Sequence, residues 1–210
     1  MEREMIMSSV LNRKKKKMQP LGYSKNELIS IQNHARQRSN TEILIYDSYM
    51  NIRLIAYQIL HDKYGFGQKR IIRVEQTIDK YREGAESGEL LARKLEFYLK
   101  EKCKIDVREQ ANMVPFRERF ALAERKIAPA SQQTAGQYLV ASICNYFSLL
   151  GVCLKTQFKF SARQINEVYE WIRYYINTLF RREQFDLTIR DIAECLAEEC
   201  NYCDSRFVGA

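Results

Sequence analysis

Three cysteines near the C-terminus have a spacing that could bind a metal ion. Cys195, Cys200 and Cys203 form a C-x4-C-x2-C pattern, and thiolates are common ligands of Zn²⁺ in tetrahedral sites. Zinc sites built from cysteines usually combine two CxxC pairs, and this chain has one. We predict no cofactor, because free thiols packed in the protein account for the same residues. The spacing leaves open whether these three cysteines bind a metal.

The histidines and carboxylates show no catalytic spacing. His34 and His61 lie outside any HExxH motif, which would place two histidines and a general base on one helix. Four aspartates that could serve metal-dependent phosphoryl transfer are spread along the chain without forming a pair. They are Asp47, Asp62, Asp106 and Asp191. We therefore expect a protein that is not an enzyme, and a nuclease is the second alternative.

Basic and aromatic residues form the third candidate group, and their chemistry suits nucleic acid. Consecutive lysines near the N-terminus would bind phosphates without regard to base sequence. A predicted helix over 67–82 adds further cations, and one over 161–182 combines arginine with aromatic rings that can stack on bases. The alternative is a solvated helix face whose rings belong to the core. The candidate nucleic-acid or partner-binding residues are Arg13, Lys14, Lys15, Lys16, Lys17, Lys69, Arg70, Arg73, Arg163, Trp171, Arg173 and Tyr174.

The positive charge of the chain is concentrated at its N-terminus. The formal net charge is +8, and residues 1–40 contain nine Lys or Arg against three Asp or Glu. Residues 41–210 contain 25 and 23, so their net charge is only +2. Because like charges at this density repel one another, we expect residues 1–22 to form a flexible basic arm.

Hydrophobic periodicity predicts helices along the rest of the chain. Apolar residues recur at steps of three and four, which is the pattern of one buried helix face. No run approaches the roughly 18 consecutive apolar residues of a membrane span, so we expect no membrane contact. The expected helices are Ser24 to near Asn40, Thr41 to about 64, 67–82, one ending near Cys103, about 135–157, 161–182 and 186–199.

The predicted helices fall into two sets with the same order, which indicates an internal duplication. Aligning Tyr64 with Phe158, an offset of 94 residues, matches the apolar positions of the helices that follow. After a three-residue insertion in the second copy, Cys103 matches Cys200. We therefore predict an all-α protein of two related multi-helix units with a flexible basic N-terminal arm. The expected boundaries are 1–22 for the arm, 23–110 for the first unit, and 111–210 for a linker helix and the second unit.

Each unit has a short aromatic elbow between two helices, YGFG at 64–67 and FKFS at 158–161. The second elbow starts an S-x-x-Q capping box, which marks the start of a helix. Gly65 would allow a positive φ in the first elbow. Lys159 stands at the same place in the second, so we expect no positive φ to be required there. The glycines lack the spacing of a phosphate-binding loop, so both elbows are predicted to be structural.

The first elbow and the helix before it resemble a segment of small helical proteins from phages and mobile elements of Firmicutes. The block LIAYQILHDKYGFGQKRI, residues 54–71, is similar to an apolar helix ending in a Leu-His-like pair and running into a Phe-Gly-Phe-Gly-x-Lys-Arg-Leu-like elbow. The resemblance covers roughly residues 44–106 and carries no catalytic motif. It implies a phage or mobile-element accessory protein, a class that includes anti-CRISPR inhibitors. The second elbow, FKFS, departs from the pattern.

These observations predict a cytoplasmic binding protein. Six cysteines without an export signal are typical of a reducing compartment. The leading hypothesis is a phage or mobile-element protein that binds nucleic acid or a nucleoprotein complex and inhibits a guide-RNA-bound CRISPR–Cas nuclease. The first alternative is a helix-turn-helix-like transcriptional regulator that binds DNA, and the second is the nuclease-type enzyme.

Overall fold

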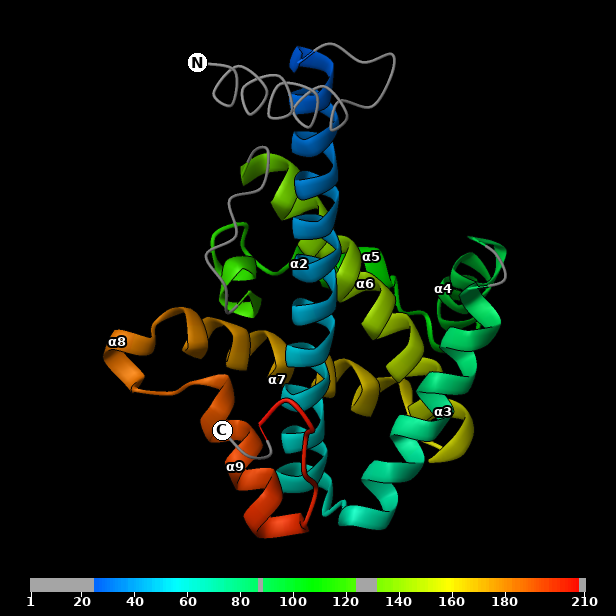
Figure 1. The fold of residues 1–210 in the computed structure, drawn as a ribbon. Coiled ribbons are helices and arrows are strands. Elements are labelled where there is room, and N and C mark those ends of the chain that lie inside the picture. Colours follow the sequence, from blue (N-terminus) through cyan, green and yellow to red (C-terminus); the bar gives the residue numbers. More distant parts are fainter. Residues whose placement is uncertain (1–24, 87–88, 124–131, 208–210) are drawn as a thin grey trace, which may run out of the picture. The chain divides into compact units, whose positions relative to one another are not determined.

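The computed structural model describes residues 25–86, 89–123 and 132–207 of the chain (Figure 1). Within these ranges the secondary structure consists of helices and turns, without a strand. The all-α prediction is therefore confirmed for this part of the protein. The predicted arm, with Arg13 and the lysines Lys14–Lys17, lies outside the described residues.

The chain divides into two compact units, Met1–Ser39 and Asn40–Ala210. The described residues of the first unit belong to α2 (Lys25–Tyr64). Helical structure is unbroken from Lys25 to Tyr64, so the predicted helix end near Asn40 is wrong. Positions 40 and 41 are Asn and Thr. Because no Gly or Pro interrupts the helix there, the backbone continues as a helix through both positions.

The second unit holds the remaining helices. The end of α2 runs through its middle in Figure 1, with α3 and α4 on one side and α9 on the other. The elements after α2 are α3 (Gln68–Glu86), α4 (Glu89–Cys103), α5 (Val107–Asn112), the 3-10 helix η1 (Glu118–Leu122), α6 (Gln132–Gln157), α7 (Ala162–Phe180), α8 (Arg182–Phe185) and α9 (Ile189–Cys200).

The most apolar of these helices, α6, is the core of the unit. Its length and composition alone would allow it to cross a membrane, but 72% of its most apolar window is buried inside the protein. It packs against α3, α4, α5, η1 and α7. Gly151 lets α7 approach closely, because a Cβ at this position would clash with the Tyr169 hydroxyl. A helix that is apolar on all sides is expected at the centre of such a bundle.

The two elbows pack against each other with matching geometry. The rings of Tyr64 and Phe160 lie 4.9 Å apart at 46°, and those of Phe66 and Phe158 lie 4.9 Å apart at 46°. The two ring pairs are equivalent under the 94-residue offset, because Tyr64 corresponds to Phe158 and Phe66 corresponds to Phe160. The helices after the elbows, α3 and α7, also bury their apolar faces at equivalent positions. These buried residues are Ile71, Val74 and Ile78 in α3, and Ile165, Val168 and Ile172 in α7.

Both elbows contain a residue with positive φ. Gly65 has a φ of 63° and Lys159 a φ of 60°, so the prediction that the second elbow needs no positive φ is wrong. The physical reason is the way each preceding helix ends. A left-handed residue turns the next N–H back toward the helix, so that Phe66 donates to the Leu60 carbonyl at 3.1 Å and Phe160 to Leu154 at 3.1 Å.

The helices that end each set stop in the same manner. Lys104 follows α4 with a φ of 57°, and Asn201 follows α9 with a φ of 52°. The next residue in each case donates its N–H back into the helix, from Ile105 to Leu99 at 3.2 Å and from Tyr202 to Leu196 at 3.0 Å. The second set therefore repeats the helix ends of the first as well as its elbow.

Candidate nucleic-acid interface

The first elbow and α3 place a row of cations over the aromatic rings of the two elbows. Gly67 precedes α3, and the buried positions of the helix turn its polar residues outward. The resulting hollow, here called the elbow groove, has a volume of about 620 Å³. Its lining residues are Tyr64, Phe66, Lys69, Arg70, Arg73, Gln157, Phe158 and Phe160.

Two arginines of the elbow groove are held against its rings. The Arg70 guanidinium lies 5.5 Å from the Phe66 ring centroid, and that of Arg73 lies 5.8 Å from the Phe158 centroid. Arg73 Nη2 also donates to Gln157 Oε1 at 3.3 Å. Cation–π contacts and this single hydrogen bond orient the guanidinium groups, and their other N–H donors remain available for a ligand.

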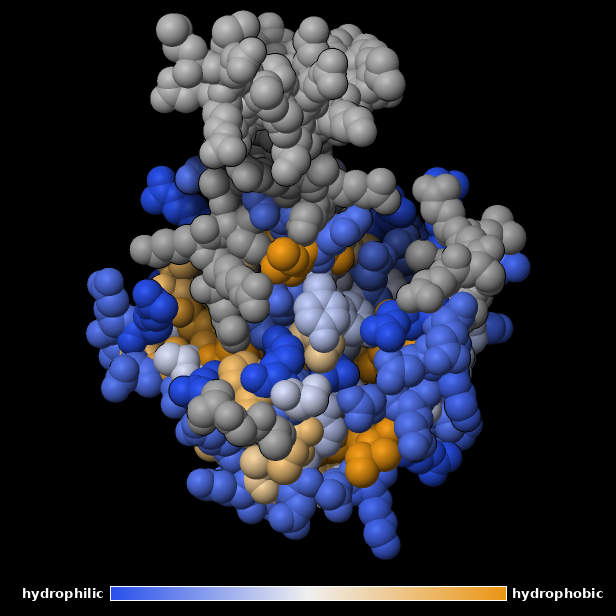
Figure 2. Space-filling model, viewed as in Figure 1, coloured by the Kyte–Doolittle hydropathy of each residue, from blue (hydrophilic) through white to orange (hydrophobic). Residues whose placement is uncertain are grey.

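A second hollow, the α3 groove, continues along the helix and has a volume of about 540 Å³. Lys80 extends the cationic row here, on the same face of α3 as Lys69 and Arg73. The surface over α3 is largely hydrophilic in Figure 2. The lining residues are Lys69, Ile72, Arg73, Gln76, Thr77, Lys80, Tyr81 and Gln157.

The cations of these two grooves are exposed and lack carboxylate partners. No ion pair joins Lys69, Arg70, Arg73 or Lys80 to a carboxylate of the described residues. Glu75, on the same helix, instead accepts from Arg53 at 2.8 Å and from a tyrosine near the C-terminus. Uncompensated like charges on one face produce a positive potential that attracts phosphates.

The other predicted residues belong to a hollow along α7, the α7 groove, with a volume of about 990 Å³. Trp171 and Tyr174 meet edge to face with ring centroids 5.6 Å apart, and Lys63 Nζ lies 4.0 Å from the Trp171 centroid. Tyr174 is 56% exposed, so one of its faces is open to solvent. The lining residues are Arg163, Asn166, Glu167, Glu170, Trp171 and Tyr174.

Arg173 does not share this groove with the other three predicted α7 residues. It is half-buried and donates to Gln110 Oε1, which ties α7 to α5. Burial lowers the pKa of its guanidinium below the usual value. Its environment is that of a residue holding two helices together. Arg163 and Tyr174 are exposed, whereas Trp171 is half-buried and packs against the core while lining the groove.

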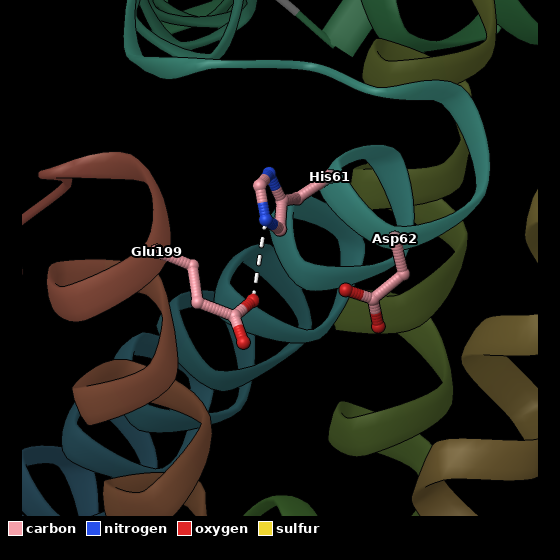
Figure 3. A group of neighbouring side chains, drawn as sticks. All are labelled: His61, Asp62 and Glu199. Carbon is pink, nitrogen blue, oxygen red and sulfur yellow. Dashed lines mark ion pairs between the residues drawn. The ribbon is translucent and has the colours of Figure 1, made fainter.

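A group of possible metal ligands lies where α2 ends beside α9, and sequence reasoning missed it (Figure 3). His61 Nε2 is 3.2 Å from Glu199 Oε2, and the ligand atoms of His61, Asp62 and Glu199 all lie within 4.8 Å of one another. The neighbouring His-Asp pair at a helix end was the only signal in the sequence. Glu199 joins it through tertiary packing, which spacing along the chain does not reveal.

The predicted cysteine pattern does not form a corresponding cluster. Among the described residues, none of Cys195, Cys200 and Cys203 belongs to a group of three or more metal-ligand atoms within this distance. Cys200 is buried and its thiol donates to the Leu196 carbonyl at 3.0 Å, whereas Cys195 and Cys203 are exposed. Five residues along a helix turn the chain through about 500°, so Cys195 and Cys200 point in different directions.

The fold and the site together define an all-α protein with a cationic groove bordered by the aromatic rings of two helix elbows. Comparison of the chain with models of protein families, with curated protein sequences and with solved structures finds no match.

Proposed function

We propose that the protein binds nucleic acid, or a nucleoprotein complex, through the elbow groove and the α3 groove. The observation that carries the proposal is the row of exposed cations on α3, Lys69, Arg70, Arg73 and Lys80, which has no ion pair to a carboxylate in the described part of the chain. Such a row releases condensed counterions when it meets a phosphate backbone, and that release drives association.

The chemistry of the grooves favours contact with phosphates over reading of bases. Phe66 is 3% exposed and Phe160 6% exposed, so neither offers a ring face on which a base could stack. The guanidinium groups of Arg70, over Phe66, and Arg73, over Phe158, suit phosphate oxygens, which arginine binds with paired N–H donors. The predicted arm, residues 1–22, would add sequence-independent attraction through Arg13 and the lysines Lys14–Lys17.

The biological setting we propose is that of a cytoplasmic phage or mobile-element accessory protein. The resemblance of residues 54–71 to proteins of phages and mobile elements in Firmicutes supports it. A guide-RNA-bound CRISPR–Cas nuclease offers exposed phosphate to a cationic groove, and inhibition of such a nuclease is the specific activity we propose.

We also propose that residues 23–110 and 111–210 arose by internal duplication. Two observations support this proposal. The two elbow ring pairs are equivalent under the 94-residue offset and have the same geometry, and Gly65 and Lys159 are left-handed at matching positions. The match extends from the elbows to the ends of α4 and α9, where Lys104 and Asn201 close the helices in the same left-handed conformation.

A helix-turn-helix-like regulator remains the second candidate, because the exposed start of α3 follows a tight turn. In that case α3 would enter the major groove of DNA. The Gln68 side chain donates to the Asn201 carbonyl at 2.7 Å, so Lys69 and Arg73 would make the contacts. This candidate requires duplex DNA as the preferred ligand and protection of a defined half-site.

The test is a binding measurement with duplex DNA, single-stranded DNA and structured RNA over a series of salt concentrations. The triple variant Lys69→Gln, Arg73→Gln, Lys80→Gln should bind at least tenfold more weakly. Its plot of log affinity against log salt should also be shallower, by about 0.7–0.9 for each phosphate that the variant no longer neutralises. Deletion of residues 1–19 should reduce the slope further if the arm contributes.

A matched control carries the same loss of charge elsewhere, in the variant Lys94→Gln, Lys102→Gln, Arg117→Gln. These three residues are exposed and lie outside both grooves. Equal losses in the two triple variants would show that net charge alone matters and would refute the groove as the binding site. Absence of binding to any of the three ligands would refute direct contact with nucleic acid.

A further inference from the structure

The junction between the end of α2 and the end of α9 has the arrangement of a metal site. His61 and Asp62 project from the last turn of α2, and Glu199 reaches toward them from α9 (Figure 3). Zinc binds imidazole nitrogen and carboxylate oxygen at about 2.0–2.2 Å, which places neighbouring ligand atoms about 3–3.5 Å apart. The 3.2 Å between His61 Nε2 and Glu199 Oε2 already has this value. An Asp62 carboxylate oxygen lies within 4.8 Å of both of these atoms, so Asp62 would have to move closer to complete the set.

The hydrogen bonding of His61 fixes which ring nitrogen faces the cluster. Nδ1 lies 3.0 Å from the Phe66 carbonyl oxygen, and because a carbonyl only accepts, Nδ1 carries the hydrogen. Nε2 therefore faces the Glu199 carboxylate, and a cation between the two atoms, either a proton on Nε2 or a metal ion, makes their 3.2 Å contact favourable. A metal-bound histidine commonly donates its other N–H to a backbone carbonyl in this way.

Asp62 is oriented by residues outside the cluster. Gln58 Nε2 donates to its Oδ1 at 2.8 Å, and the Tyr175 hydroxyl donates to its Oδ2 at 3.3 Å. Gln58 is only 7% exposed, and its Oε1 is a buried acceptor without a partner in the described part of the protein. An unpaired buried acceptor beside a carboxylate is costly, and water bound to a metal could supply the missing donor.

The surroundings of the cluster are acidic, which favours a cation. Glu199 follows Glu198 on α9, and Cys195 lies one helical turn earlier. Cys195 is exposed, and the pKa of its thiol is raised by partial desolvation and then by Glu199, Glu198 and Asp62. This field repels further negative charge and attracts a positive ion.

We propose that His61, Asp62 and Glu199 bind one divalent transition-metal ion of the zinc type, with water in the remaining position. The imidazole nitrogen favours Zn²⁺ over Mg²⁺ and Ca²⁺, which prefer all-oxygen sites. The ion links the end of α9 to the last turn of α2 beside the first elbow. It therefore stabilises the second unit and is independent of the proposed binding of nucleic acid.

The experiment uses the full chain, purified without a histidine tag and stripped of metal. Zn²⁺ is titrated in competition with a chromogenic indicator, and the melting temperature is measured with Zn²⁺ and with Mg²⁺. We expect one Zn²⁺ per chain and a rise in melting temperature with Zn²⁺ only, because a ligand that binds the folded state stabilises it. His61→Gln and Glu199→Gln should each weaken Zn²⁺ binding about tenfold or more.

Glu198→Gln is the matched control, since Glu198 is an exposed carboxylate on the same helix but outside the cluster. It should weaken Zn²⁺ binding no more than about twofold, because an exposed charge outside the cluster is screened by solvent. Circular dichroism of each variant without metal checks that the helices are intact. Failure of the wild-type protein to bind Zn²⁺ would overturn the proposal and leave His61 and Glu199 as a simple ion pair. Undiminished binding by His61→Gln, or loss of binding only in Cys195→Ser or Cys203→Ser, would also overturn it.

Discussion

The α3 groove and the α7 groove occupy equivalent positions after each elbow but differ in chemistry. With the 94-residue offset, Lys69 corresponds to Arg163, Arg73 to Glu167, and Lys80 to Tyr174. The other three positions that line the α7 groove also line the α3 groove: Asn166 matches Ile72, Glu170 matches Gln76, and Trp171 matches Thr77. One groove is therefore cationic, whereas the other combines aromatic rings with two carboxylates.

Where α3 and α7 pack on the rest of the unit, the two halves differ less, both at their buried apolar positions and at one half-buried hydrogen bond. The Tyr81 hydroxyl lies 3.2 Å from Thr156 Oγ1, and the Tyr175 hydroxyl donates to Asp62 at 3.3 Å. These are the same positions in the two halves, and in each half the tyrosine hydroxyl is hydrogen-bonded, to a threonine hydroxyl in one and to an aspartate carboxylate in the other. Close packing restricts what the interior can accept, whereas an exposed helix face can change its charge at little cost in stability. The comparison implies that charge, and not shape, determines which groove binds phosphate.

The largest expected effect comes from giving the α3 groove the residues of the α7 groove. The double variant Arg73→Glu, Lys80→Tyr lowers the local charge by three units, and it should weaken binding of nucleic acid about 100-fold at low salt. The effect should shrink as salt increases, because exposed charges are screened. A filter-binding or anisotropy titration at two salt concentrations measures both quantities.

The control for this exchange is Lys94→Tyr, Lys102→Glu on α4, which changes the charge by the same amount. Both lysines are exposed, so neither double variant should lower the melting temperature by more than a few degrees. If the α3 exchange left binding intact, the difference between the grooves would have no bearing on function.

Placing an α3-groove cation in the α7 groove should let the α7 groove bind nucleic acid. Glu167→Arg replaces a carboxylate of the groove by a cation, next to Arg163 and the open ring of Tyr174. We expect an affinity about tenfold higher for single-stranded ligands, because arginine beside aromatic rings favours unpaired bases. The same titrations with duplex and single-stranded ligands measure it. A decrease in affinity would mean that Glu167 itself contacts the ligand.

Periodicity and capping patterns were sufficient to predict most of the long helices, although not the continuity of α2 past Asn40 or the short helices α5 and α8. The buried faces of α3 and α7 follow the expected spacing, and the Ser161–Gln164 capping box is confirmed at the start of α7. These features depend on residues close together in the sequence, where side-chain direction along a helix is fixed by its geometry. The exposure of Lys69 and Arg73 could be predicted for the same reason.

The omissions at the candidate site involve residues that are distant in the sequence, whereas the errors at Asn40 and Lys159 are local. Glu199 meets His61 only because α9 packs beside the end of α2, and Arg173 is held by Gln110 of α5. Lys159 adopts a positive φ because a helix end must be closed there, a demand of the backbone that residue type alone does not show. The roles of the predicted interface residues in binding stay predictions.

Substitutions at the two matching left-handed positions, Gly65 and Lys159, should change the stability of the protein in opposite directions. Gly65→Ala should destabilise the protein by about 1 kcal/mol, because an L-residue at positive φ is strained although no atom lies within 4 Å of the new Cβ. Lys159→Gly should stabilise it by a similar amount, since it relieves the same strain. Urea unfolding monitored by circular dichroism measures both changes. Changes of the same sign would show that the two elbows are not conformationally equivalent.

The smallest expected effect concerns the matched tyrosines. Burial, and then the nearby Asp62 carboxylate, raise the pKa of Tyr175 from 10.0 to about 12. Because the folded-state pKa lies above the unfolded value, this tyrosine contributes stability below about pH 10 that is lost as the pH rises through about 12. Asp62→Thr replaces the tyrosine–carboxylate pair by a tyrosine–threonine pair, like the pair that Tyr81 forms with Thr156 at the equivalent position. The pKa of Tyr175 should then fall, because the carboxylate no longer opposes its ionisation.

The measurement is a pH titration of the tyrosine Cζ signals by NMR, with Tyr175→Phe used to assign the resonance. The amide spectrum of each variant at neutral pH checks that the variant has the same fold as the wild-type protein. A Tyr175 pKa that is unchanged in Asp62→Thr would assign the whole shift to burial. In that case the two tyrosines would be equivalent in environment as well as position, and the difference between the halves would be confined to the exposed grooves.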